Sequence, residues 1–420
     1  MPIIISNISV PLLGLVDTAV VGHLSDAAYL AGVTLGATLF SFLFWGFGFL
    51  RMGTTGAVSQ AAGAKDWSAV IRLLQQGVLM ALAIALVLLL FQGWLIPQGL
   101  ALLAESGAAR DQAALYAGVR IWSAPAVLIN YVLMGWFLAQ RNSGFALQML
   151  LLGNGINILL DLVFVVILGW QVQGVAFASL IADYSVLVAG GWLALKRIRQ
   201  LQPSWQRQPW VAEEFKALFQ VNHQLMVRTW LLLGSMAYFT SQGAAFGSET
   251  LAANAILMQL IMMASYALDG YAHAVEALVG QAEGAKDELL RNSIVSAGAV
   301  MSGLSVGLIS VLYVLCGDYL IAMLTDLPRV RLLAEDYLLW AVWIPLLAAG
   351  SYLLDGVYIG LMRSDVMRNG MLMAFNVFLL TQWGLSDLGN QGLWLSFAIF
   401  MLLRSLVMAL HYCFWLRRAR

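Results

Sequence analysis

The chain has 420 residues, of which 61% are hydrophobic and only 10% are charged, and its mean hydropathy is +0.83. Soluble domains carry about 25% charged residues, so this composition excludes a soluble globular protein and predicts a polytopic membrane protein. The formal net charge is zero, which gives no indication of nucleic-acid binding. The two cysteines, Cys316 and Cys413, are expected near opposite membrane faces and are predicted to stay unpaired.

Twelve apolar segments are long enough to cross a bilayer, and all are predicted to be helices because lipid offers no partner for an open backbone. The first starts almost at Met1, and no cleavable signal peptide is expected. In chain order the predicted spans are 3–22, 30–58, 70–92, 113–139, 144–169, 173–195, 219–246, 251–282, 292–314, 335–361, 366–384 and 390–416.

Lysine and arginine are distributed unequally between the two sets of loops. One set, with the chain ends, holds fifteen of them, whereas the other holds four, Arg110, Arg120, Arg329 and Arg331. The richer side is cytoplasmic by the positive-inside rule. We therefore expect both termini in the cytoplasm.

The sequence repeats itself. QAAGAKD at residues 60–66 returns as QAEGAKD at 281–287, an offset of 221, and WSAPAVL at 122–128 resembles WIPLLAA at 343–349. Two copies of a six-helix unit with the same membrane orientation are typical of secondary transporters. The predicted organisation is a first lobe over 1–195, a charged cytoplasmic linker over 196–218 and a second lobe over 219–420. A channel and a membrane enzyme are the alternatives.

The first span carries an acid, Asp17, in an otherwise uncharged apolar run, where a carboxylate is costly. Asp161 in the fifth span and Ser179 in the sixth lie at the same depth, roughly 8–12 Å below the outer surface by helix rise, and Asn157 lies one turn from Asp161 on the same face. Two carboxylates in one layer can share a proton. The alternative is that each acid is separately satisfied as a structural group.

This acid layer has no counterpart in the second half of the chain. At the repeat offset, Asp17 corresponds to Tyr238, and the segment corresponding to Asp161, NVFLL at 376–380, holds no acid. Coupling is therefore predicted in the first lobe alone. Two prolines of the first span, Pro2 and Pro11, remove backbone hydrogen bonds and can bend it.

The second lobe has its own polar stripe in the eighth span. Asp269, His273 and Glu276 share one helix face, and Asp355 lies at membrane depth in the tenth span. A metal-binding site is one interpretation of this stripe, but three ligands on one helix cannot enclose a small cation alone. Arg51 in the second span is predicted either to pair with Asp269 or Glu276 as a gate or to be satisfied by carbonyls of its own lobe.

Several of these motifs together resemble the DinF-like branch of the multidrug and toxic compound extrusion (MATE) family, over nearly the whole chain. They are PLLGLVDTAVVGHL (11–24), FLRMGTTGAVSQAAGAKD (49–66), NILLD (157–161), QGVAFASLIADY (173–184) and YALDGYAHAVEALVGQAEGAKD (266–287).

The resemblance implies an all-α membrane protein of twelve helices in two pseudo-symmetric lobes that exports amphipathic, often cationic, organic compounds in exchange for H⁺ or Na⁺. It implies a first-lobe cavity with Asp17, Asn157, Asp161 and Ser179, and a bending proline at Pro2. Asp355 resembles an acid that other branches use for Na⁺.

The expected function is a proton-coupled multidrug exporter, without enzymatic activity, cofactor or bound metal, working as a monomer in the bilayer. A sodium-coupled exporter and a flippase for lipid-linked precursors are the alternatives. The acidic first-lobe layer argues against the flippase, which needs a basic cavity for phosphates.

Overall fold

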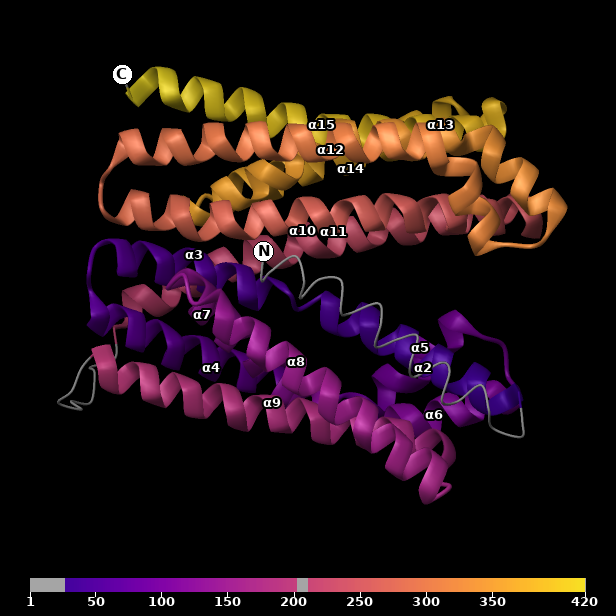
Figure 1. Cartoon of the computed structure of the whole chain (residues 1–420), viewed down its shortest axis with the longest axis horizontal. Helices are drawn as coiled ribbons and strands as arrows, with labels where there is room; N and C mark the ends of the chain where they lie inside the picture. The colour runs from indigo at the N-terminus through magenta and orange to yellow at the C-terminus, as the bar shows by residue number, and fades with distance from the viewer. Residues whose placement is uncertain (1–26, 202–210, 420) are drawn as a thin grey trace. The chain divides into compact units, whose positions relative to one another are not determined.

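The computed structural model describes residues 27–201 and 211–419, and every regular element in these ranges is helical (Figure 1). Asp17, Pro2 and Pro11 lie outside the described residues. The chain divides into two compact units, residues 1–219 and 220–420.

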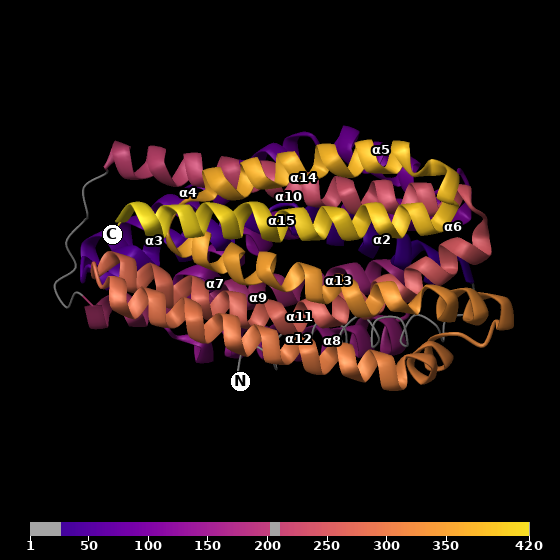
Figure 2. The ribbon, with the colours of Figure 1, turned by 90° about the horizontal axis from the view of Figure 1, so that it is seen from above.

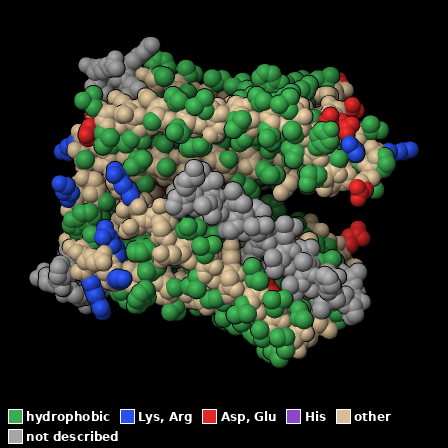
Figure 3. All heavy atoms as spheres, viewed as in Figure 1, with side chains coloured by type: hydrophobic (Ala, Val, Ile, Leu, Met, Phe, Trp, Pro, Cys, Tyr) green, Lys and Arg blue, Asp and Glu red, His purple; other side chains and the backbone are tan. Residues whose placement is uncertain are grey.

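Unit 1 contains eight described α-helices that run up to the linker. They are α2 (Ala27–Trp45), α3 (Phe49–Gly63), α4 (Trp67–Leu90), α5 (Gln92–Leu103), α6 (Ala108–Arg120), α7 (Ala124–Ala139), α8 (Ser143–Asp161) and α9 (Gln171–Leu201). Figure 3 shows Lys and Arg side chains gathered at the end of this unit where α3 turns into α4 and α9 ends.

Unit 2 begins within α10 (Ala212–Ala245) and continues through five further α-helices. They are α11 (Ser248–Gly284), α12 (Glu288–Leu324), α13 (Pro328–Gly360), α14 (Ser364–Gly384) and α15 (Gly389–Ala419). Figure 2 shows α11, α12 and α13 running beside one another, and the three helices are in contact. Aromatic rings pack in the core at steep angles to one another: the Phe239 ring centroid lies 4.8 Å from that of Trp394, edge to face, and 5.0 Å from that of Phe397, tilted.

Nine helical stretches of the described chain are long and apolar enough to cross a membrane, and the all-helical prediction is confirmed. The predicted span 30–58 is two helices, α2 and α3. At Phe47 and Gly48 the backbone N–H groups bond three residues back, to Phe44 and Trp45, at 2.9 and 3.0 Å. Gly46 and Gly48 flank this tighter turn, and such glycine-rich breaks bend helices.

Two other stretches also differ from the expected spans. α5 was not predicted, and α6 starts five residues before the expected boundary. Arg120, which was counted with one set of loops although the predicted span 113–139 contains it, is the last residue of α6 and lies inside the continuous apolar stretch Ala108–Ala139. Beyond Asp161, α8 changes into a π-helix over Leu162–Ile167, where the Leu168 N–H bonds five residues back to Val163 at 2.9 Å.

The repeat recognised in the sequence recurs in the backbone at the same offset of 221. Lys65 and Lys286 both take left-handed conformations, with φ of 59° and 57°, and so do Arg141 and Met362, with φ of 61° and 56°. The following aspartates cap the next helix in the same way: Asp66 accepts from the Ala69 N–H and Asp287 from the Leu290 N–H, both at 2.9 Å.

Close helix crossings repeat as well. A β-carbon at Gly135 of α7 would lie 2.5 Å from the carbonyl oxygen of Arg51 in α3. At the equivalent position in α13, a β-carbon at Gly356 would lie 2.4 Å from the carbonyl oxygen of Ala272 in α11. Only glycine permits such an approach of two backbones, so each unit is built around the same contact.

Candidate functional site

The α8–α9 hairpin brings two of the predicted site residues into contact. Asn157 of α8 donates a hydrogen bond from Nδ2 to the Ser179 Oγ of α9, at 3.2 Å. Asn157 is 2% exposed. Asp161 lies one helical turn closer to the connection between α8 and α9 and is completely buried. A buried amide, a partly buried hydroxyl and, one helical turn away, a buried carboxyl group thus follow one another between two largely apolar helices.

A cavity of about 200 Å³ opens on the side of this contact away from Asp161. Asn157 and Ser179 lie at one end of it, and Met134 and Met149 supply flexible apolar wall, which adapts to ligands of different shape. Its polar lining comes from Arg120, Asn130, Tyr131, Asn154, Asn157, Ser179 and Asp183.

The cavity wall also carries an ion pair that the sequence analysis missed. NH1 of Arg120, the last residue of α6, donates to the carboxylate of Asp183 in α9 and to the Ser123 hydroxyl. The guanidinium also lies over the ring of Phe44, with Cζ 5.4 Å from the centroid. Asn130 Nδ2 donates to the Asp183 carbonyl oxygen at 3.0 Å, which ties this turn of α9 to α7.

One sequence signal could have identified Asp183. It lies four residues after Ser179, on the same face of α9, just as Asp161 lies four residues after Asn157 on α8. Because the two helices run in opposite directions, Asp161 and Asp183 lie on opposite sides of the Asn157–Ser179 contact, each about 6 Å along the helix axis from it.

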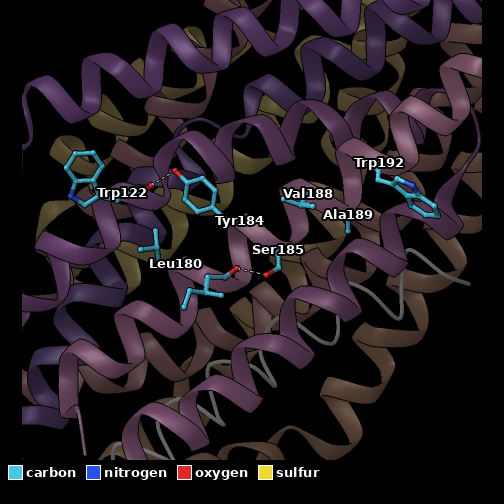
Figure 4. Close-up of a pocket in the computed structure, with 8 residues that line it drawn as sticks. Trp122, Leu180, Tyr184, Ser185, Val188, Ala189 and Trp192 are labelled. Carbon is cyan, nitrogen blue, oxygen red and sulfur yellow. Dashed lines mark hydrogen bonds between the residues drawn. The ribbon is translucent and has the colours of Figure 1, made fainter. Parts of the chain in front are cut away.

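A larger groove on the outer face of α9 has a different character (Figure 4). It measures about 860 Å³ and lies between Trp122 and Trp192, with an apolar floor that includes Leu180 and Val188. Its polar groups bond to backbone: Tyr184 donates to the Trp122 carbonyl at 3.1 Å and Ser185 to the Ile181 carbonyl at 2.7 Å. An apolar groove flanked by tryptophans suits contact with lipid.

The second unit holds a buried charge cluster around Asp355. The Asp355 Oδ2 accepts a hydrogen bond from NH2 of Arg228, and NH2 of Arg404 lies 3.4 Å from the same oxygen. All three side chains are buried. Arg228 comes from α10, Asp355 from α13 and Arg404 from α15, so that the cluster joins three helices.

The remaining predicted residues lie on α3 and α11. Glu276 is buried, and Asp269 and His273 lie on the same helix face. Within residues 27–201 and 211–419, no three His, Cys, Asp or Glu side chains are arranged to hold a metal ion. Arg51 is buried in α3 of unit 1; its pairing with Asp269 or Glu276 remains a prediction.

Comparison with known proteins identifies the family. The sequence pattern of the MatE family matches residues 2–163 and 226–383, most of the chain. The chain belongs to the MATE family. It is 42% identical to the DNA damage-inducible protein F of Escherichia coli, over 97% of this chain and 89% of that protein. It is also 25% identical to a probable multidrug resistance protein NorM of Pseudomonas syringae, over 100% of this chain and 94% of that protein.

Solved MATE structures share the fold. A MATE crystal structure in the bent conformation covers 98% of this chain, and this chain covers 92% of it, with a TM-score of 0.86 at 19% identity. An outward-facing multidrug resistance MATE transporter covers 97% of this chain and is itself covered to 92%, with a TM-score of 0.83 at 19% identity. As a MATE protein, the chain is a multi-pass membrane transporter for the ion-coupled efflux of small organic compounds, and it is not an enzyme.

Proposed function

We propose that this MATE transporter exports amphipathic organic compounds in exchange for protons, with Asp17 as the residue that is protonated. It acts as a monomer in the bacterial inner membrane with both termini in the cytoplasm. The observation that carries the proposal is the polar layer of unit 1, in which Asn157 and Asp161 are buried and Asn157 bonds to Ser179, beside a cavity large enough for a ligand head group.

The chemistry of this layer suits proton exchange. A carboxyl group in a low-dielectric environment is stabilised in its protonated form, and an amide and a hydroxyl can bond to either form. In the proposed cycle, a proton from outside neutralises Asp17, the first span bends near Pro2 and Pro11, and the cavity contracts and expels the substrate. Release of the proton to the cytoplasm restores the cavity, because proton and substrate favour different states.

Sodium coupling through Asp355 is less well supported. One carboxylate oxygen of Asp355 already faces two guanidinium groups, those of Arg228 and Arg404. A sodium ion bound there would add a third positive charge at one carboxylate, in a buried region where like charges repel strongly. This geometry argues against a sodium site at Asp355.

Transport in proteoliposomes with a pH gradient or a sodium gradient imposed separately tests the proposal. We expect the wild type to accumulate a fluorescent organic cation when the pH gradient alone is applied. Asp17→Asn keeps the shape of the side chain but cannot titrate, so proton-driven transport should fall to the level of empty liposomes.

Asp111→Asn is the matched control, because Asp111 is an exposed acid in the first turn of α6; it should transport like the wild type. Full proton-driven transport by Asp17→Asn, or transport driven by the sodium gradient alone, would contradict the proposal.

A further inference from the structure

The Arg120–Asp183 pair gives the first-unit cavity both signs of charge. Both residues line the cavity, and their side chains keep 15% and 25% of their surface exposed. The two charges belong to different helices, α6 and α9, and Asp183 lies one helical turn from Ser179 on α9. A ligand in this cavity therefore meets a guanidinium and a carboxylate side by side.

Arg120 retains donors that a ligand could use. Its bonds to Asp183 and Ser123 both come from NH1, and Tyr116, four residues earlier on α6, also interacts with the guanidinium. A guanidinium carries five N–H donors in a planar fork, which matches a carboxylate or phosphate group better than an ammonium does. Arg120 can therefore donate hydrogen bonds to an anionic group of a ligand while it remains bonded to Asp183.

The energetics of the pair distinguish between classes of ligand. A simple cation that binds Asp183 takes the carboxylate away from Arg120 and leaves a partly buried guanidinium without its counter-charge, which is strongly unfavourable. A simple anion at Arg120 does the same to Asp183. A ligand that carries both charges can satisfy both residues at once, so that no buried charge loses its partner.

We propose that the first-unit cavity prefers zwitterionic amphipathic compounds, whose anionic group pairs with Arg120 and whose cationic group pairs with Asp183. This inference rests on the proposed function in one respect, that the cavity is where substrate binds. Arg120 is then a specificity-determining residue that selects for a carboxylate or phosphate beside the cation. The apolar part of the ligand lies against Met134, Met149 and Leu150.

A matched pair of small ligands tests the preference. N-benzyl-N,N-dimethylglycine is a zwitterion, and its methyl ester is a cation with the same ring and the same quaternary ammonium. We would measure binding of both, radiolabelled, to the full-length protein in lipid nanodiscs by equilibrium dialysis. The wild type should bind the acid about tenfold more tightly than the ester, the scale of one charge-assisted bidentate contact.

Substitutions of Arg120 should abolish this preference specifically. In Arg120→Met, the acid should bind no better than the ester, and the ester should bind more tightly than it does to the wild type, because Asp183 no longer has to leave a guanidinium to meet the cation. Arg120→Lys should retain part of the preference, because lysine keeps the charge but lacks the fork. Arg110→Met is the control: Arg110 is outside the cavity, where its NH2 donates to the Pro97 carbonyl at 3.2 Å, and the variant should behave like the wild type.

The outcomes separate this inference from the proposed function. Equal binding of acid and ester by the wild type, no saturable binding of the acid, or a preference that survives in Arg120→Met would each overturn it. The wild-type ratio needs no substitution, so the inference is testable even where Arg120→Met does not fold. Full proton-driven transport by Asp17→Asn would instead reject the coupling proposal and leave the ligand preference in place.

Discussion

At the residue scale, the second unit depends on one carboxylate to balance two buried arginines. Asp355 lies between Arg228 and Arg404, and its removal leaves both guanidinium groups without that counter-charge. Losing one partner of a buried ion pair costs about 3–5 kcal/mol, far more than losing a partner at the surface. The cluster should therefore be among the most sensitive positions of this unit.

Thermal unfolding of the purified protein checks this expectation. Asp355→Asn should lower the stability of the protein by about 3 kcal/mol or more. Glu335→Gln breaks the exposed Arg331–Glu335 pair of α13, whose N–O distance is 3.0 Å, and should cost less than about 1 kcal/mol. Similar unfolding midpoints for the two variants would show that the Asp355 cluster is not a structural ion pair.

The residues of the first-unit site were only partly accessible to sequence reasoning. Asn157 and Ser179 could be placed at one depth by counting helix turns, because both lie near the turn that joins α8 and α9. Arg120 was not placed, because it was counted with the loop residues although the predicted span 113–139 contains it. Because no partner for Asp183 was considered, it was noted only as part of the motif at residues 173–184.

At the scale of helices, each unit depends on a glycine at a backbone crossing. Gly135 and Gly356 occupy equivalent positions of the repeat, and both face a carbonyl oxygen of the neighbouring helix. An added methyl group must push two packed helices apart. Overpacking of this kind typically costs about 1–3 kcal/mol of stability. The same substitution at an open helical glycine is harmless or slightly stabilising.

Alanine substitutions at four glycines make this contrast measurable. Gly135→Ala and Gly356→Ala should each lower the thermal unfolding temperature. Gly118→Ala in α6 and Gly303→Ala in α12 should leave it unchanged or raise it, because no heavy atom lies within 4 Å of their added β-carbons. If all four variants unfold alike, the crossings are not close contacts.

The helix boundaries show where a hydrophobicity pattern stops being informative. Apolar residues continue through the break between α2 and α3, so the pattern predicted one helix over 30–58, whereas the local hydrogen bonds change at Gly46–Gly48. By contrast, the repeat QAAGAKD and QAEGAKD predicted equivalent structure correctly, because its glycine, lysine and aspartate specify a helix end and the next helix start.

At the scale of the whole molecule, the unequal distribution of Lys and Arg predicts which helix ends face the cytoplasm. The two ends of α12 give a direct test, since Glu288 begins this helix and Asp326 follows it, and both are exposed. In a background in which Cys316 and Cys413 are replaced by alanine, a membrane-impermeant maleimide added to intact cells should label Asp326→Cys but not Glu288→Cys. The opposite pattern would reverse the proposed topology.

The apolar composition was sufficient to predict the helical fold class, and the repeat was sufficient to predict two similar units. Lipid forces every spanning backbone into a helix, so span number and orientation follow from hydrophobicity and charge. The depth and pairing of individual charges inside a unit depend on helix starts, tilts and breaks, which hydrophobicity does not encode. The Asp355 cluster, drawn from three helices, could only be seen in three dimensions.

The π-helical end of α8 gives the site a further property. Between Asp161 and Leu168 the chain holds one residue more than an α-helix of the same length needs, as the Leu168 to Val163 hydrogen bond shows. Because of that extra residue, the segment beyond Asp161 can rewind into regular α-helix and rotate relative to α9, while the buried carboxyl group keeps its place. The hairpin can thus change its shape at one end without disturbing the polar layer at the other.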